Sequence, residues 1–299
     1  MTGKPARKVT WRTFLTATMG LVALTFLLYN QVADWWNDRL HAEALDRVNE
    51  AVVIGPDAKL EAIRVEAQAY NQQLLASGKT EGYMEQIDPA GGGVMGRIKI
   101  PNIGVDIPIF HTSNDDVLRR GAGHMAETTL PVGGENTHAA ITAHRGLAQS
   151  RLFTDLDKVE EGHKFTLEVL GEALVYEVFE TRIVDPHETD GRVVQPGRDL
   201  VTLITCDPLG INTERMLVTG ERVIPTPVED IEGAMQRSDQ PRFPWWLVAA
   251  VAGVLVLGGL ARWARKPTVV AAAGKDDDED EESEESPSSQ SQMLAGDLG

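Results

Sequence analysis

The segment Leu200-Val201-Thr202-Leu203-Ile204-Thr205-Cys206 ends an apolar, β-like run on the single cysteine of this 299-residue chain. One thiol cannot close an intramolecular disulfide, so Cys206 is either a buried apolar residue or a reactive nucleophile. Arg215 follows nine residues later, just before a second apolar run that begins at Met216. A hairpin between the two runs would return Arg215 to the strand end where Cys206 lies.

Residues 92–225 contain short apolar runs with two-residue alternation. Turn residues such as Pro101-Asn102 and Gly133-Gly134 separate them. This pattern is typical of an all-β barrel or sandwich and not of alternating βαβ units, and the length suffices for one hydrophobic core. The runs cover 96–100, 105–110, 139–142, 165–169, 175–183, 200–205 and 216–223.

The region ahead of this β domain, residues 34–91, has a helical pattern. Apolar residues recur at three- and four-residue spacing over 35–54 and again over 57–76. The pair Gly55-Pro56 predicts a break between two helices. We therefore expect a two-helix stalk that packs against the β domain.

Two uncharged stretches predict transmembrane helices at 13–33 and 243–261. No charged residue occurs between Arg12 and Asp34 or between Arg242 and Arg262, and about 20 apolar residues cross a bilayer. The first stretch also fits a cleaved signal peptide, but no convincing small-residue cleavage site follows it, so an uncleaved anchor is favoured.

Basic residues predict the orientation of these spans, because they mark the cytoplasmic side of a membrane. They precede the first span and follow the second. We therefore expect a multi-pass cell-membrane protein with cytoplasmic ends at 1–12 and 262–299, a linker at 226–242, and the β domain outside the cell. The basic residues are Lys4, Arg7, Lys8, Arg12, Arg262, Arg265 and Lys266.

The C-terminal end is strongly acidic. Residues 274–299 carry −9 of the formal net charge of −17. Such a tail cannot bury apolar area, so we expect it to be disordered. No basic stripe interleaved with aromatic residues occurs, so nothing indicates a nucleic-acid partner.

A cysteine becomes a nucleophile when a neighbouring base or cation favours its thiolate. His144 is the candidate base, because it follows the apolar run 139–143 at the point where a strand gives way to a loop. Arg215 is the candidate for stabilising an oxyanion. From the residues alone, a buried structural cysteine with surface His and Arg residues stays open as the alternative.

The sequence resembles the sortases, the membrane-bound cysteine transpeptidases of Gram-positive bacteria. The segment 202–206 followed by Arg215 resembles their TLxTC…R signature, and five further motifs, in the same order as in the family, resemble the class C, pilin-polymerising branch. These motifs are Val94-Met95-Gly96-Arg97-Ile98-Lys99-Ile100-Pro101, Leu118-Arg119-Arg120-Gly121-Ala122-Gly123-His124, Leu130-Pro131-Val132-Gly133-Gly134, Thr142-Ala143-His144-Arg145-Gly146-Leu147 and Leu152-Phe153-Thr154-Asp155-Leu156.

The resemblance implies a closed sortase β-barrel in which His144 is the catalytic histidine, Cys206 the nucleophile and Arg215 the transition-state arginine. It implies cleavage of an LPXTG-like sorting signal on a pilin or surface protein, followed by transfer to an amine. That amine is a pilin lysine or, in a housekeeping enzyme, a peptidoglycan crossbridge. No cofactor or metal is expected. A non-catalytic scaffold barrel is the alternative from another class, and a thiol oxidoreductase is disfavoured because no second cysteine exists.

Class C sortases usually carry a lid with an Asp-Pro-aromatic anchor. In this chain Asp88-Pro89 is followed by Ala90, so we expect the lid to be shortened or lost. Among the other histidines, His124 is expected to have a structural role. The rest are expected at the surface; they are His41, His111, His138, His163 and His187.

Overall fold

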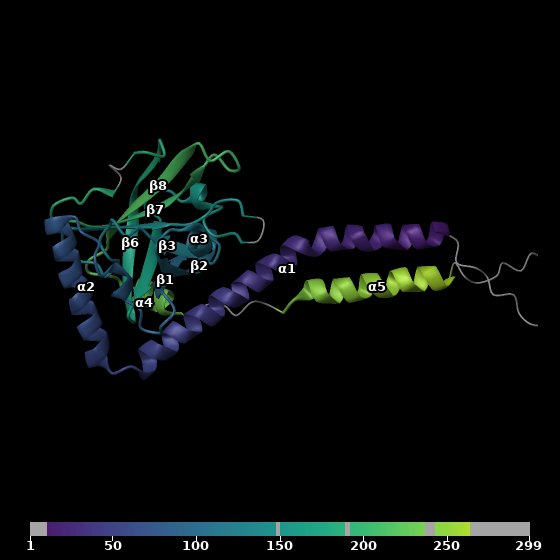
Figure 1. Cartoon of the computed structure of the whole chain (residues 1–299), viewed down its shortest axis with the longest axis horizontal. Coiled ribbons are helices and arrows are strands. Elements are labelled where there is room, and N and C mark those ends of the chain that lie inside the picture. The colour runs from purple at the N-terminus through teal and green to yellow at the C-terminus, as the bar shows by residue number, and fades with distance from the viewer. Residues whose placement is uncertain (1–10, 148–149, 189–191, 237–242, 264–299) are drawn as a thin grey trace, which may run out of the picture.

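The computed structural model describes residues 11–147, 150–188, 192–236 and 243–263. Most of the predicted cytoplasmic ends at 1–12 and 262–299 lies outside the described residues, namely residues 1–10 and 264–299, which include the acidic tail. Five α-helices, three 3-10 helices and a β-barrel make up the described part (Figure 1).

Eight strands form a closed barrel in the order β1-β2-β3-β4-β7-β8-β6-β5. Two neighbouring pairs, β2 with β3 and β4 with β7, are parallel, and the other pairs are antiparallel. The all-β prediction is therefore confirmed, in its closed-barrel form. The strands are β1 Val94–Ile100, β2 Val105–His111, β3 Ala122–His124, β4 Thr137–Thr142, β5 Lys164–Val169, β6 Glu172–Val184, β7 Asp199–Asp207 and β8 Glu214–Arg222.

Alternating residues of these strands fill the barrel. Phe165 and Tyr176 are fully buried and stack with their ring centroids 5.5 Å apart. Gly220 on β8 makes room for them, because a Cβ atom at that position would lie 2.6 Å from the Phe165 ring. Full burial of a large apolar side chain contributes about 1.5–3 kcal/mol, so this core supplies the main driving force for folding.

The predicted two-helix stalk is present as α1 (Trp11–Ile54) and α2 (Asp57–Ser77), with the break at Gly55-Pro56. The last turns of α1 pack Ala44 and Val48 against Val94 and Phe110 of the barrel. The buried side chain of Asn71 on α2 accepts a hydrogen bond from the Leu130 N–H (2.6 Å) and donates one to the Leu130 carbonyl (3.2 Å). Both helices are therefore fixed to the barrel.

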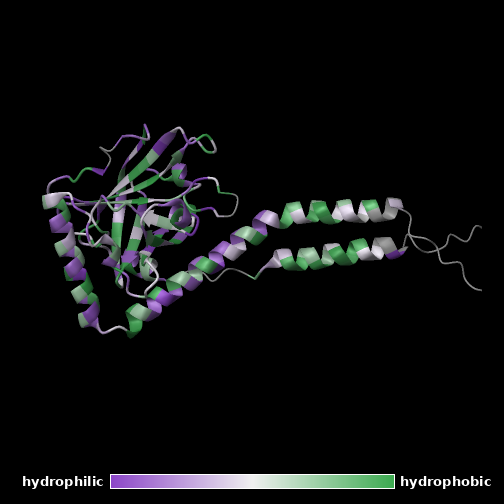
Figure 2. Ribbon diagram, viewed as in Figure 1, coloured by the Kyte–Doolittle hydropathy of each residue, from purple (hydrophilic) through white to green (hydrophobic). Residues whose placement is uncertain are grey.

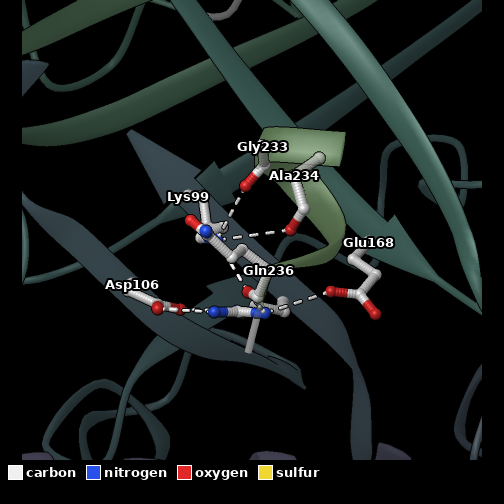
Figure 3. Close-up of polar contacts among 7 residues, drawn as sticks. Lys99, Asp106, Glu168, Gly233, Ala234 and Gln236 are labelled. Carbon is white, nitrogen blue, oxygen red and sulfur yellow. Dashed lines mark hydrogen bonds and ion pairs between the residues drawn. The ribbon is translucent and has the colours of Figure 1, made fainter. Parts of the chain in front are cut away.

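The stretch 226–242, predicted as a linker, contains the helix α4 (Val228–Met235). The Lys99 ammonium on β1 donates to the carbonyls of Gly233 (3.0 Å) and Gln236 (2.8 Å) at the end of this helix, as Figure 3 shows. Lys164 on β5 pairs with Asp230 at 2.7 Å. The C-terminal carbonyls of a helix favour a cation, so these contacts hold α4 against the barrel.

The helix α5 (Trp245–Trp263) lies beside the N-terminal part of α1 (Figure 1), and Trp35 meets Trp246 with ring centroids 6.0 Å apart. Apolar residues cover most of both helices there (Figure 2). None of the helices within the described ranges combines the length and the apolar character that crossing a bilayer requires. The spans predicted at 13–33 and 243–261 are helical but are not confirmed as membrane spans.

The expectation that the remaining histidines lie at the surface is wrong for three of them: His41, His111 and His138 are buried. Two are held by hydrogen bonds, His111 to the Gln86 carbonyl (2.5 Å) and His138 to the Thr202 hydroxyl (2.7 Å). A lone histidine in a strand, as at His111 and His138, or in a helix, as at His41, carries no sign of which face it occupies, so the sequence could not predict its burial.

His124 has the structural role expected for it. Its Nε2 donates to the Thr129 carbonyl and its Nδ1 accepts from the Tyr83 hydroxyl, each at 2.9 Å. The ring is completely buried, and this burial lowers the pKa of His124 from 6.5 to about 4. His124 therefore joins the segment after α2 to the barrel as a neutral ring.

This pKa predicts an acid-labile fold. Above pH 6.5 the His124 ring is neutral in both the folded and the unfolded protein. Between pH 6.5 and 4 only the unfolded chain takes up the proton, so the free energy of unfolding decreases as the pH is lowered. We expect this ring alone to remove about 2–3 kcal/mol of unfolding free energy by pH 4.5. Urea unfolding at several pH values, with NMR titration of the ring, checks this. A ring that becomes charged above pH 5.5 in the folded protein would contradict the prediction.

Candidate active site

His144, Cys206 and Arg215 lie in one row across the ends of three adjacent strands. In the parallel pair of β4 and β7, Thr142 aligns with Ile204, so two residues further His144 reaches the level of Cys206. In the antiparallel pair of β7 and β8, Cys206 aligns directly with Arg215. Neighbouring strands lie about 4.8 Å apart and residues two apart share a face, so the three side chains point to the same side.

Hydrogen bonds extend the pairing of β4 and β7 just beyond the last paired residues. The Ala143 N–H donates to the Ile204 carbonyl (3.2 Å), and the buried Thr205 hydroxyl donates to the Ala143 carbonyl (2.8 Å). The Phe153 N–H donates to the His144 carbonyl (3.1 Å), which ties the following loop to the same point. The backbone on both sides of the row is therefore held in place.

All three residues line one cavity of about 370 Å³. Its floor is apolar and lies on the outer face of the barrel, where Ala140, Val184, Ile204 and Leu217 form a small buried cluster. Cys206 is half-buried in this cavity. The arrangement therefore offers a thiol at the edge of an apolar trough with an imidazole on one side and a guanidinium on the other. Further lining residues are Ser113, Leu118, Met125, Thr142, Ala143, Pro186, Glu188 and Arg192.

Asp115 is a site residue that the sequence reasoning missed. Its Oδ1 lies 3.3 Å from Nε2 of His144, and its other oxygen pairs with Arg119 at 2.6 Å. The pKa of Asp115 is lowered, mainly by the hydrogen bond from Arg119 and also by His144. Asp115 thus orients the imidazole from the side of the helix α3 (Asp115–Leu118). The acidic pair that opens this helix was visible in the sequence, but nothing linked it to a histidine 29 positions away.

Backbone carbonyls orient Arg215. Its Nη1 donates to the Glu214 carbonyl (2.8 Å) and to the Asn212 carbonyl (3.2 Å). Among the residues that the structure describes, no carboxylate forms an ion pair with this guanidinium. Its positive charge is therefore available to an anion that develops beside Cys206.

Comparison with known proteins places the chain in a family. The sortase domain family matches residues 98–223. Crystal structures that share the fold include sortase C-1 from Actinomyces oris (40% identity, TM-score 0.52, covering 55% of this chain and 98% of that one). They also include sortase C1 from Streptococcus agalactiae (35% identity, TM-score 0.59, covering 62% and 100%). The chain belongs to the sortase family.

Sortases are cysteine transpeptidases, and both of these solved relatives are named as sortases of class C. Curated relatives include sortase A of Streptococcus agalactiae, 34% identical over 132 residues, which cover 43% of this chain and 52% of that protein. Sortase D of Bacillus subtilis is 28% identical over 138 residues, which cover 45% of this chain and 67% of that protein. The chain thus spans between 52% and 67% of the length of its curated relatives.

The segment between α2 and β1, where class C enzymes usually carry their lid, stays away from the cavity of this sortase. None of the residues 79–93 lines it. Tyr83 is buried and donates to His124, and the carboxylate of Asp88 accepts from the Gly92 N–H (2.9 Å) in its own loop. The expected shortening of the lid stays a prediction.

The described residues contain no cluster of three metal-ligating side chains. A larger cavity of about 730 Å³ lies between α1, β5 and α4, lined by residues such as Asp38, Lys164 and Asp230, and includes none of the three aligned residues.

Substitution of Arg215 with Ala tests its position in the row. We expect the fold to persist and the rate of Cys206 acylation to fall by about two to three orders of magnitude, because removal of one hydrogen-bond donor to an oxyanion lowers a rate by about that factor. Single-turnover acylation followed by intact mass measures the rate. Arg198→Ala, at the opposite end of β7, is the matched control and should react like the parent. An Arg215→Ala enzyme as fast as the parent would show that the guanidinium has no such role.

Proposed function

We propose that this sortase cleaves an LPXTG-like sorting signal between Thr and Gly and transfers the resulting acyl group to an amine, with a pilin lysine as the acceptor. The observation that carries the proposal is the single row of His144, Cys206 and Arg215 above an apolar cavity. A Clostridium perfringens sortase C, solved with a C-terminal cell wall sorting motif, is 37% identical (TM-score 0.56, covering 60% of this chain and 96% of that one).

The first half-reaction follows from the order of the row. The Cys206 thiolate attacks the Thr carbonyl carbon, and the carbonyl oxygen becomes an oxyanion on the Arg215 side, where the guanidinium stabilises it. His144 protonates the glycine amine as the C–N bond breaks. The product is a thioester on Cys206. The contact of Asp115 with Nε2 of His144 holds the orientation of the imidazole during this step.

The second half-reaction uses the same groups in reverse. The acceptor amine gives a proton to His144 and attacks the thioester carbonyl, and Arg215 again stabilises the oxyanion. The thiolate leaves, and an amide joins the two proteins. The apolar floor at Val184, Ile204 and Leu217 suits the Leu and Pro side chains of the signal, which would lose water contact there.

The class of the acceptor is the finer part of the proposal. The solved relatives with class C names favour a pilin lysine; one of them, from Streptococcus pneumoniae, is described in terms of pilin substrate specificity and is 38% identical (TM-score 0.56, covering 60% of this chain and 96% of that one). The curated sortase A relatives favour a second candidate, transfer to a peptidoglycan crossbridge. Both acceptors supply a primary amine to the same thioester.

The first experiment incubates the full-length chain with an LPXTG peptide and measures the intact mass, beside a Cys206→Ala control. We expect a thioester adduct that the control lacks, because only the thiolate can hold the acyl group. A thiol that iodoacetamide alkylates but the peptide does not acylate would contradict the proposed signal. An unreactive thiol would favour the scaffold barrel.

The acceptor is tested on the isolated adduct. A pilin-derived lysine peptide should release the acyl group as an isopeptide faster than a crossbridge peptide does at equal concentration. The reverse order would contradict the pilin assignment and favour the housekeeping reaction, while leaving the thioester chemistry in place.

We also propose that α1 and α5 hold the enzyme at the cell membrane with the barrel outside. What supports this is their side-by-side packing, the exposure of apolar residues such as Phe26 (79%) and Leu255 (69%), and the basic residues beyond both ends. A membrane site would present anchored substrates to Cys206 at high effective concentration.

Protease accessibility in intact protoplasts checks this placement. We expect the barrel to be cleaved from outside while tags at both ends stay protected until the membrane is permeabilised. Degradation of either tag in intact protoplasts, or release of the chain by a carbonate wash, would contradict the proposed orientation.

A further inference from the structure

A partly buried ion pair lies one residue beyond the catalytic row. Arg145 follows His144 and Asp207 follows Cys206 in the sequence, and the guanidinium of Arg145 forms an ion pair with the carboxylate of Asp207. The side chain of Arg145 is 7% exposed and that of Asp207 15% exposed. Neither residue lines the cavity that holds the thiol.

This pair stands where the backbone connection between the two strands has ended. The paired residues of β4 and β7 stop at Thr142 and Ile204, and the bond from the Ala143 N–H to the Ile204 carbonyl is the last backbone contact recorded between them. β7 continues to Asp207 because β8 supports it there. Beyond that bond, the end of β4 is held by the Thr205 hydroxyl on the Ala143 carbonyl and by the Phe153 N–H on the His144 carbonyl. Neither bond joins His144 to the residues at or beyond Cys206, so a contact one residue further along both chains adds a constraint on the separation of the imidazole and the thiol.

Arg145 has the geometry to supply that constraint. Besides Asp207, it pairs with Asp157 at 2.9 Å through Nη2 and donates from Nε to the Thr154 carbonyl at 3.2 Å. A planar guanidinium held at three points keeps one orientation. Because side chains alternate along β7, Asp207 points to the face opposite Cys206, and Arg145 reaches it there.

We propose that Arg145 and Asp207 form a latch that holds the end of β4 against the end of β7 and so positions His144 beside Cys206. This inference rests on the proposed transpeptidase function. Arg145 and Asp207 are positioning residues, since they contact neither the thiol nor the cavity. Loss of the latch lets the imidazole move, and a displacement of about 1 Å can cost a reaction on the order of a hundredfold in rate.

A positioning role predicts a specific kinetic pattern. Asp207→Asn keeps the shape of the side chain and removes its charge, so the latch weakens while the apolar cavity remains. We expect kcat for the sorting peptide to fall by about ten- to a hundredfold and KM to stay within about twofold, because the substrate contacts are unchanged. Glu221→Gln is the matched control: it removes the ion pair of Glu221 with Arg198 (2.7 Å) near the other end of β8 and should leave both constants unchanged.

A second pair of variants keeps the test valid if Asp207→Asn does not fold, which circular dichroism and thermal unfolding of the full-length chain would show. Arg145→Lys retains a cation opposite Asp207, whereas Arg145→Gln does not. We expect kcat of the lysine variant to exceed that of the glutamine variant by about tenfold, since only the lysine variant preserves an ion pair across the two strand ends.

Three outcomes would overturn the latch. The first is an Asp207→Asn enzyme with kcat within twofold of the parent, the second is equal kcat for Arg145→Lys and Arg145→Gln, and the third is a change in KM with kcat unaltered. Failure of the proposed function is recognised separately, because the parent itself would then form no thioester with the peptide. In that case the latch is tested by the rate at which iodoacetamide alkylates Cys206. If the latch holds His144 beside the thiol, Cys206 of Asp207→Asn should react about tenfold more slowly than Cys206 of the parent, because the imidazole activates the thiol. Equal rates in the two proteins would overturn the latch.

Discussion

The parallel pairing of β4 with β7 is the constraint on which the site depends. These strands are joined through a long crossover, so no turn between them sets their register; the register comes from burial of Ala139, Ile141, Val201 and Leu203 in the core. A slip by one residue would turn His144 to the opposite face from Cys206. The packing that stabilises the barrel therefore also aligns the base with the nucleophile.

The sequence predicted the parts of this structure that local patterns encode. Alternating apolar runs and turn residues indicated the barrel, and Gly55-Pro56 marked the break between α1 and α2. β3 was missed because three residues are too short to show alternation, although the parallel pair with β2 helps to close the barrel. The docking of α4 was missed as well, since Lys99 gives no local sign of the helix end that it binds.

The residues of the site were predicted unevenly, because only contacts between residues close in the sequence follow from a local pattern. Cys206 and Arg215 belong to one hairpin, so their proximity follows from nine residues of spacing. His144 was predicted from its place at the end of a strand and from the family resemblance, whereas the support of Asp115 and of the pair Arg145 and Asp207 was not found at all. These contacts join positions 29 and 62 residues apart, and no pattern in a single sequence records such distances.

Different interactions position Cys206 and Arg215 on one side of the site and His144 on the other. The antiparallel pair of β7 and β8 continues past Cys206 to Asp207, so its backbone hydrogen bonds fix the thiol relative to Arg215. On the His144 side the pairing has already ended, and side chains take over its role. Asp115 acts on the imidazole from solvent, where an ion pair contributes little, whereas Arg145 acts from a buried position with three acceptors. The separation of base and nucleophile therefore depends more on the buried arginine than on the exposed carboxylate.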